Sequence, residues 1–116
     1  MHEVSVALSL VDGLSEEAAR RGITRINTVH LRIGALTGIV EDALVFAWEL
    51  ATASTVAAGS RLQIERVPLA IYCRPCQAER TLSGGPNLHC PQCGEPSAEV
   101  VRGRELQLVS LEVPDD

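Results

Sequence analysis

Hydrophobic and polar positions along this 116-residue chain follow two different periods. Between residues 4 and 20 the apolar side chains recur every three or four residues, which is typical of an amphipathic helix. They are Val4, Ala7, Leu8, Val11, Leu14 and Ala18. Gly22 is expected to end this helix. Gly13 interrupts the pattern, at a cost of about 1 kcal/mol relative to alanine.

A second helix is predicted over residues 40–53, after a loop at residues 34–38. Glu41 and Asp42 stabilise its first turn, because negative charge is favourable at the amino end of a helix. Leu44, Phe46 and Trp48 are expected to pack this helix against the rest of the fold.

Three segments alternate with a period of two, as half-buried strands do, and they cover residues 24–34, 61–69 and 104–113. In the first, Ile26, Val29, Leu31 and Ile33 are apolar, and His30 is expected to face solvent. Pro68 marks where the second must end or bulge. In the third, Leu106 and Leu108 have one parity and Leu111 and Val113 the other, which predicts a bulge near Val109 and Ser110.

Residues 72–99 differ in style, because they hold all four cysteines and four of the six prolines but few large apolar side chains. Such a stretch cannot build a hydrophobic core of its own. The fold class predicted is therefore α+β: two helices packed on a small three-stranded sheet, with an inserted zinc-ribbon-like module held by cysteines. In this division residues 1–70 and 101–116 form the α/β domain, and residues 71–100 form the insert.

The cysteines have the spacing C-x2-C-x13-C-x2-C, which is a strong sign of a metal site; they are Cys73, Cys76, Cys90 and Cys93. Two such turns give tetrahedral tetrathiolate coordination, typical of structural Zn(II). Gly94 can adopt the positive φ that such a turn requires, and Gln77 fits the same position less well. Arg74 and Arg80 are candidates to offset the negative charge. Rubredoxin-like iron, a redox dithiol pair and a zinc ribbon used for binding are the alternatives.

His89, beside the second cysteine pair, is interpreted as a polar loop residue, with an approach to the metal as the alternative.

Charge and composition restrict the functional class. The net charge of −5, without any cluster of basic residues, argues against nucleic-acid binding. No apolar run approaches the length that spans a bilayer, and the amino terminus does not resemble a secretory signal. We therefore expect a soluble cytoplasmic protein, in which four cysteines are metal ligands rather than disulfides.

The first three residues, Met1, His2 and Glu3, are a candidate second metal site. A free α-amine, the deprotonated amide of His2 and its imidazole form fused chelate rings in a plane. This nitrogen-rich geometry suits Ni(II) or Cu(II) better than tetrahedral zinc. The fourth position falls to the backbone nitrogen or carboxylate of Glu3, to water, or to a ligand from a partner. Protons leave as the metal enters, so affinity should rise with pH.

Four features occur together in this chain: the amino-terminal MHE, the segment LRIGALTG, the two CxxC pairs and the segment GREL at residues 103–106. In this order they resemble the HypA/HybF hydrogenase nickel-incorporation family over essentially the whole chain. The resemblance implies nickel ligands at Met1 and His2, with Glu3 adjoining, and structural zinc at Cys73, Cys76, Cys90 and Cys93.

The same resemblance implies a metallochaperone that delivers Ni(II) during maturation of [NiFe] hydrogenase, without enzymatic activity. Its implied partners are a HypB-type GTPase and the large subunit of the hydrogenase, and relatives also serve urease maturation. We expect a monomer or homodimer with no nucleic-acid or membrane partner. The alternative function is a zinc-ribbon interaction module without nickel.

Overall fold

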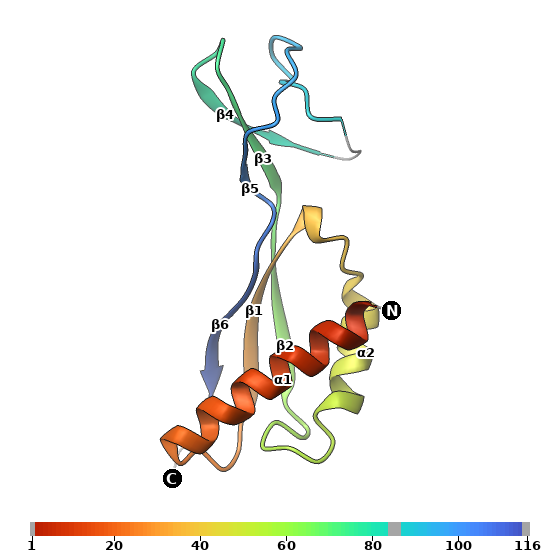
Figure 1. The fold of residues 1–116 in the computed structure, drawn as a ribbon, viewed down its shortest axis with the longest axis vertical. Coiled ribbons are helices and arrows are strands. Elements are labelled where there is room, and N and C mark those ends of the chain that lie inside the picture. The colour runs from red at the N-terminus through yellow and green to blue at the C-terminus, as the bar shows by residue number, and fades with distance from the viewer. Residues whose placement is uncertain (1, 84–86, 115–116) are drawn as a thin grey trace. The chain divides into compact units, whose positions relative to one another are not determined.

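The computed structural model describes residues 2–83 and 87–114, and Figure 1 shows the order of their elements. Two helices, one 3-10 turn and two three-stranded sheets are described, with strand orders β2-β1-β6 and β4-β3-β5. Contacts divide the chain into two compact units. The first comprises Met1–Leu31, Ile39–Glu65 and Gln107–Asp116, and the second Arg32–Gly38 and Arg66–Leu106. The predicted insert, residues 71–100, lies wholly within the second unit, and the domain division itself stays a prediction.

Helix α1, His2–Arg21, begins two residues earlier than its apolar pattern predicted and runs through Gly13 without a break. Gly22 adopts φ +69° and ends the helix, as predicted. The buried face is narrower than the pattern suggested: its members are Glu3, Ala7, Val11, Leu14 and Ala18. Val4 and Leu8 are exposed, so the prediction that they face the core is wrong.

Helix α2, Glu41–Ala51, packs beside α1 (Figure 1). Leu44 and Trp48 are buried as predicted, and the indole Nε1 of Trp48 donates a hydrogen bond to Ser60 Oγ at 2.9 Å. Phe46 is 65% exposed, so the prediction that it packs inside is wrong. The helical period places Phe46 well away from Leu44 and Trp48 on the helix surface.

The first sheet contains the three predicted strands, β2 (Arg61–Val67), β1 (Thr28–Gly34) and β6 (Leu106–Glu112). Val29, Leu31 and Ile33 are buried, which confirms the predicted alternation of β1. In β6, Leu108 and Leu111 are half-buried, whereas Val109 and Ser110 between them are both exposed. Two consecutive residues on one face are what the predicted bulge requires.

The second sheet follows directly, because Pro68 ends β2 and β3 (Leu69–Cys73) begins one residue later. Strand β3 pairs antiparallel with β4 (Ala78–Leu82) and with β5 (Val100–Arg102). Ala70 and Ile71 are fully buried in β3, so a small apolar strip supports the cysteine region. The sequence pattern did not predict this sheet.

Within the second unit, Gly34 and Gly103 approach one another closely. A Cβ atom added to Gly34 would lie 2.1 Å from the carbonyl carbon of Gly103. The N–H of Gly34 donates to the carbonyl of Glu105 at 2.8 Å, and the N–H of Gly103 donates to Glu105 Oε1 at 2.9 Å. The 3-10 turn Ala35–Thr37 continues this contact, since Leu36 N–H donates to the Gly103 carbonyl. The LRIGALTG and GREL segments are therefore two halves of one contact.

Neither helix in the described part of the chain combines the length and apolar character needed to cross a membrane.

Candidate metal centres

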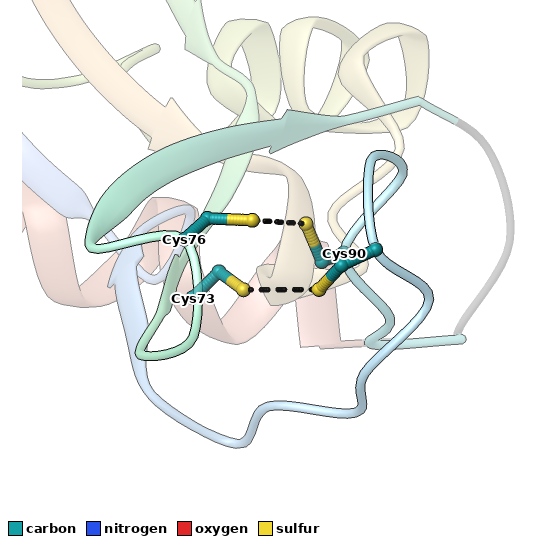
Figure 2. A group of neighbouring side chains, drawn as sticks. Cys73, Cys76 and Cys90 are labelled. Carbon is teal, nitrogen blue, oxygen red and sulfur yellow. Dashed lines mark hydrogen bonds between the residues drawn. The ribbon is translucent and has the colours of Figure 1, made fainter.

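All four cysteines meet at one place in the second unit, as their spacing predicted. Cys73 ends β3, Cys76 lies in the turn before β4, and Cys90 and Cys93 lie in the long connection between β4 and β5. Figure 2 shows Cys76 facing Cys90 across the centre. The four Sγ atoms lie within 4.8 Å of one another, and none is in a disulfide.

The sulfur separations fit a tetrahedral metal. Cys73 Sγ lies 3.5 Å from Cys93 Sγ, and Cys76 Sγ lies 3.9 Å from Cys90 Sγ. Tetrahedral geometry with Zn–S bonds of about 2.3 Å places sulfurs about 3.8 Å apart, between these two values. Four sulfur donors also leave no open coordination position. The cysteines therefore form a zinc site of the closed, structural kind.

The two CxxC turns are related but unequal. Gly94, which follows the second pair, has φ +79°, and its N–H donates to the Cys90 carbonyl at 2.8 Å. Gln77, which follows the first pair, has φ +53° and donates to the Arg74 carbonyl at 3.1 Å. The predicted positive φ at Gly94 is confirmed, and Gln77 occupies the equivalent position as predicted. Glycine adopts this left-handed conformation freely, whereas glutamine adopts it at a steric cost.

The pKa values of Cys90 and Cys73 are shifted in opposite directions. Backbone hydrogen bonding, chiefly from Cys93, lowers the pKa of Cys90 to about 6 in spite of its burial. The backbone N–H of Cys76 lowers the pKa of Cys73, but burial and the other three sulfur atoms outweigh it and raise that pKa to about 12. Four thiolates at this spacing repel one another, so a cation among them is required to hold all four ionised.

Arg80 of β4 supplies part of the compensating charge. Its guanidinium lies beside the sulfurs of Cys76 and Cys90, and these raise its pKa. The Nε atom of Arg80 is buried and has no hydrogen-bond partner in the described structure. Arg74, also predicted to offset this charge, instead pairs with Glu99 at 2.6 Å and is largely exposed.

His89 is exposed in the loop and pairs through its backbone with Pro96. The four-cysteine group does not include it, which supports its interpretation as a polar loop residue. His30 does not simply face solvent as predicted: its Nε2 lies 2.7 Å from Glu112 Oε2 and its side chain is only partly exposed.

At the other candidate site, Met1 lies outside the described residues, whereas His2 and Glu3 open helix α1. The side chain of His2 is 56% exposed. Glu3 is buried, and its Oε2 accepts a hydrogen bond from the backbone N–H of Val40 at 3.0 Å. The pKa of the Glu3 carboxyl group is lowered, mainly by this hydrogen bond from Val40 and to a smaller extent by a hydrogen bond from the backbone N–H of Glu3 itself.

Sequence reasoning missed this contact of Glu3. The only signal in the sequence was weak. Valine at position 40 cannot cap the helix that follows it, so an acceptor from elsewhere in the chain was to be expected.

Comparison with known proteins gives a consistent result. Residues 1–113 match the family model described as "Hydrogenase/urease nickel incorporation, metallochaperone, hypA". A hydrogenase maturation factor HypA from Chloroflexus aurantiacus is 48% identical over 114 residues, which cover 98% of this chain and all of that protein. A hydrogenase maturation factor HypA from Roseiflexus sp. is 46% identical over 116 residues, which cover 100% of this chain and 94% of that protein.

Two solved structures are similar along nearly their whole length. The solution structure of a HypA protein superimposes with a TM-score of 0.71 at 25% identity, covering 98% of this chain and 97% of that one. That of the Ni metallochaperone HypA from Helicobacter pylori gives 0.68 at 23% identity, covering 98% of both, and bears on the fold alone.

Proposed function

We propose a nickel-delivery function for this chain, because it belongs to the HypA family of hydrogenase and urease nickel-incorporation metallochaperones. Ni(II) is the cargo and binds at the amino terminus, to the α-amine of Met1 and to the amide and imidazole nitrogens of His2, with Glu3 adjoining. Zinc at the four cysteines stabilises the second unit. The protein acts as a maturation factor and not as an enzyme, as the relatives' names support.

The start of α1 carries this proposal. The first four N–H groups of a helix have no acceptor within the helix. His2 is the first residue of α1, so its amide can lose a proton to a metal without breaking a helical hydrogen bond. Its imidazole is exposed and accessible to the same ion. A helix that begins at once also holds these nitrogens near a folded surface.

Such a site suits delivery, because it can release what it binds. All its ligands come from consecutive residues, and the side chain of His2 is exposed, so a protonated amine or a competing ligand on a partner dismantles it. The proposed partners are a HypB-type GTPase, the [NiFe] hydrogenase large subunit and urease maturation proteins.

The test is a titration of Ni(II) into the untagged protein, into His2→Ala, and into a form with two residues added before Met1. Both altered forms should lose the terminal site and the absorption band of planar nitrogen-bound nickel. His89→Ala is the matched control, since it removes another exposed histidine and should bind as the parent does. Equal binding by all forms would favour the alternative, a zinc-ribbon interaction module without nickel.

A further inference from the structure

Helix α2 begins without a cap of its own. Val40, the residue before its first turn, has an extended backbone and offers no side-chain hydrogen bond. In a capping box, a glutamate three residues into the helix accepts the N–H of the residue that precedes it. In α2 that position is Ala43, which has no acceptor. The carboxylate of Glu3, from α1, accepts the Val40 N–H instead.

Glu3 is therefore fixed while its neighbour His2 is presented to solvent. Glu3 is 8% exposed as a residue, whereas the side chain of His2 is 56% exposed. Burying a carboxylate is unfavourable unless it is hydrogen-bonded, and the amino end of α2 supplies both a donor and a favourable dipole. The Oε2 atom that accepts this bond lies 4.0 Å from the imidazole Nε2 of His2.

We propose that Glu3 is a positioning residue: its carboxylate fastens the first turn of α1 to the start of α2 and is not a nickel ligand. This inference rests on the proposed function. The nickel ligands are then nitrogen atoms of Met1 and His2, and Glu3 has at most its backbone nitrogen to contribute. With residue 3 fixed, the first turn of α1 from His2 onward is ordered before the metal arrives. Without this contact the first turn frays, and binding has to order it again.

The experiment compares Ni(II) affinity among variants of the untagged full-length protein. Glu3→Gln keeps an oxygen acceptor for Val40 and should bind within about threefold of the parent. Glu3→Ala removes the acceptor, and reordering roughly one residue should weaken binding about tenfold, with an unchanged nickel absorption spectrum. Glu16→Ala is the matched control: it removes the same charge from an exposed position of α1 and should bind as the parent does.

Adding Val40→Ser to Glu3→Ala separates positioning from simple stabilisation. Serine gives α2 a side-chain cap of its own, so the thermal midpoint should recover, but it cannot fasten residue 3, so nickel affinity should stay low. Hydrogen exchange of the Val40 amide gives a second readout. It should be slow in the parent, stay slow with nickel bound, and become fast in Glu3→Ala.

Several results would overturn the inference. They are equal losses in Glu3→Gln and Glu3→Ala with a changed nickel spectrum, unweakened binding by Glu3→Ala, recovery of nickel affinity with Val40→Ser, and fast exchange at Val40 once nickel binds. The failure of the proposed function would look different. There, His2→Ala would bind nickel as the parent does, whatever the Glu3 variants do.

Discussion

Apart from Glu3 and Thr52, the side chains buried in and beside α1 and α2 are aliphatic or aromatic, whereas the centre of the cysteine region is four sulfur atoms. Leu44 and Trp48 stabilise the first unit because their apolar surface is buried, and each Å² buried contributes about 25 cal/mol to the free energy of folding. The loops that carry Cys76 and Cys93 have little such area, and a metal must hold them. A metal that stabilises the fold has to remain bound, so a metal that is delivered needs a different and more open site, which we propose at the start of α1.

Removing zinc should show the largest difference between the two regions, because it should unfold the cysteine region and leave the helical region folded. With a strong chelator, amide signals of residues 73–83 and 87–99 should lose their dispersion, because structural zinc contributes on the order of 10 kcal/mol to such sites. Trp48 lies in the first unit, so its fluorescence should hardly change. Zinc added back should restore the spectrum. Simultaneous loss of both signals would show that the regions do not differ in this way.

Leu44→Ala tests the converse, since Leu44 is fully buried. Removing its side chain should destabilise the first unit by about 3 kcal/mol through lost burial and a residual cavity. Denaturant unfolding followed by Trp48 fluorescence measures this loss. The zinc content should stay at one ion per chain. Val45→Ala, on the exposed side of the same helix, is the control and should unfold almost as the parent does.

The smallest effects concern the two CxxC turns. Gly94→Ala should weaken zinc retention by about 1 kcal/mol, because alanine at φ +79° is strained although its Cβ would meet no other atom within 4 Å. Gln77→Gly should strengthen retention by roughly half as much, since it relieves strain but frees the unfolded chain. Competition with a zinc chelator measures both. Unchanged zinc retention in both variants, or shifts opposite in sign to these, would mean that backbone strain does not tune the site.

Hydrophobic periodicity and cysteine spacing predicted most of the first unit and the metal site. The α1, α2, β1, β2 and β6 segments each repeat a local pattern, and the cysteine spacing has few geometric solutions. The position following each cysteine pair was also foreseen, because a tight turn under two sulfurs requires the conformation that Gly94 and Gln77 adopt.

What escaped prediction depends on contacts between distant residues. Glu3 has the polarity of a surface residue, and only the proximity of Val40, 37 positions later, makes its burial favourable. Val4 and Leu8 lie at helical spacing but at the edge of the buried face. Strand β3 is a short apolar run without alternation, and β4 and β5 are short and mixed in polarity, so their pairing has no periodic signature of its own.

The contact of Gly34 with Gly103 has a consequence for exchanging parts between relatives. The cysteine loops resemble a cassette that could be cut out at residues 71 and 100, yet Gly103 and its neighbours pack against residues 34–36. In a hybrid, a side chain at position 34 would collide with the backbone of Gly103, and one at position 103 would crowd Leu69 and strain the backbone at φ +121°. A graft should therefore carry residues 32–38 together with residues 66–106, two stretches of sequence transplanted as one piece.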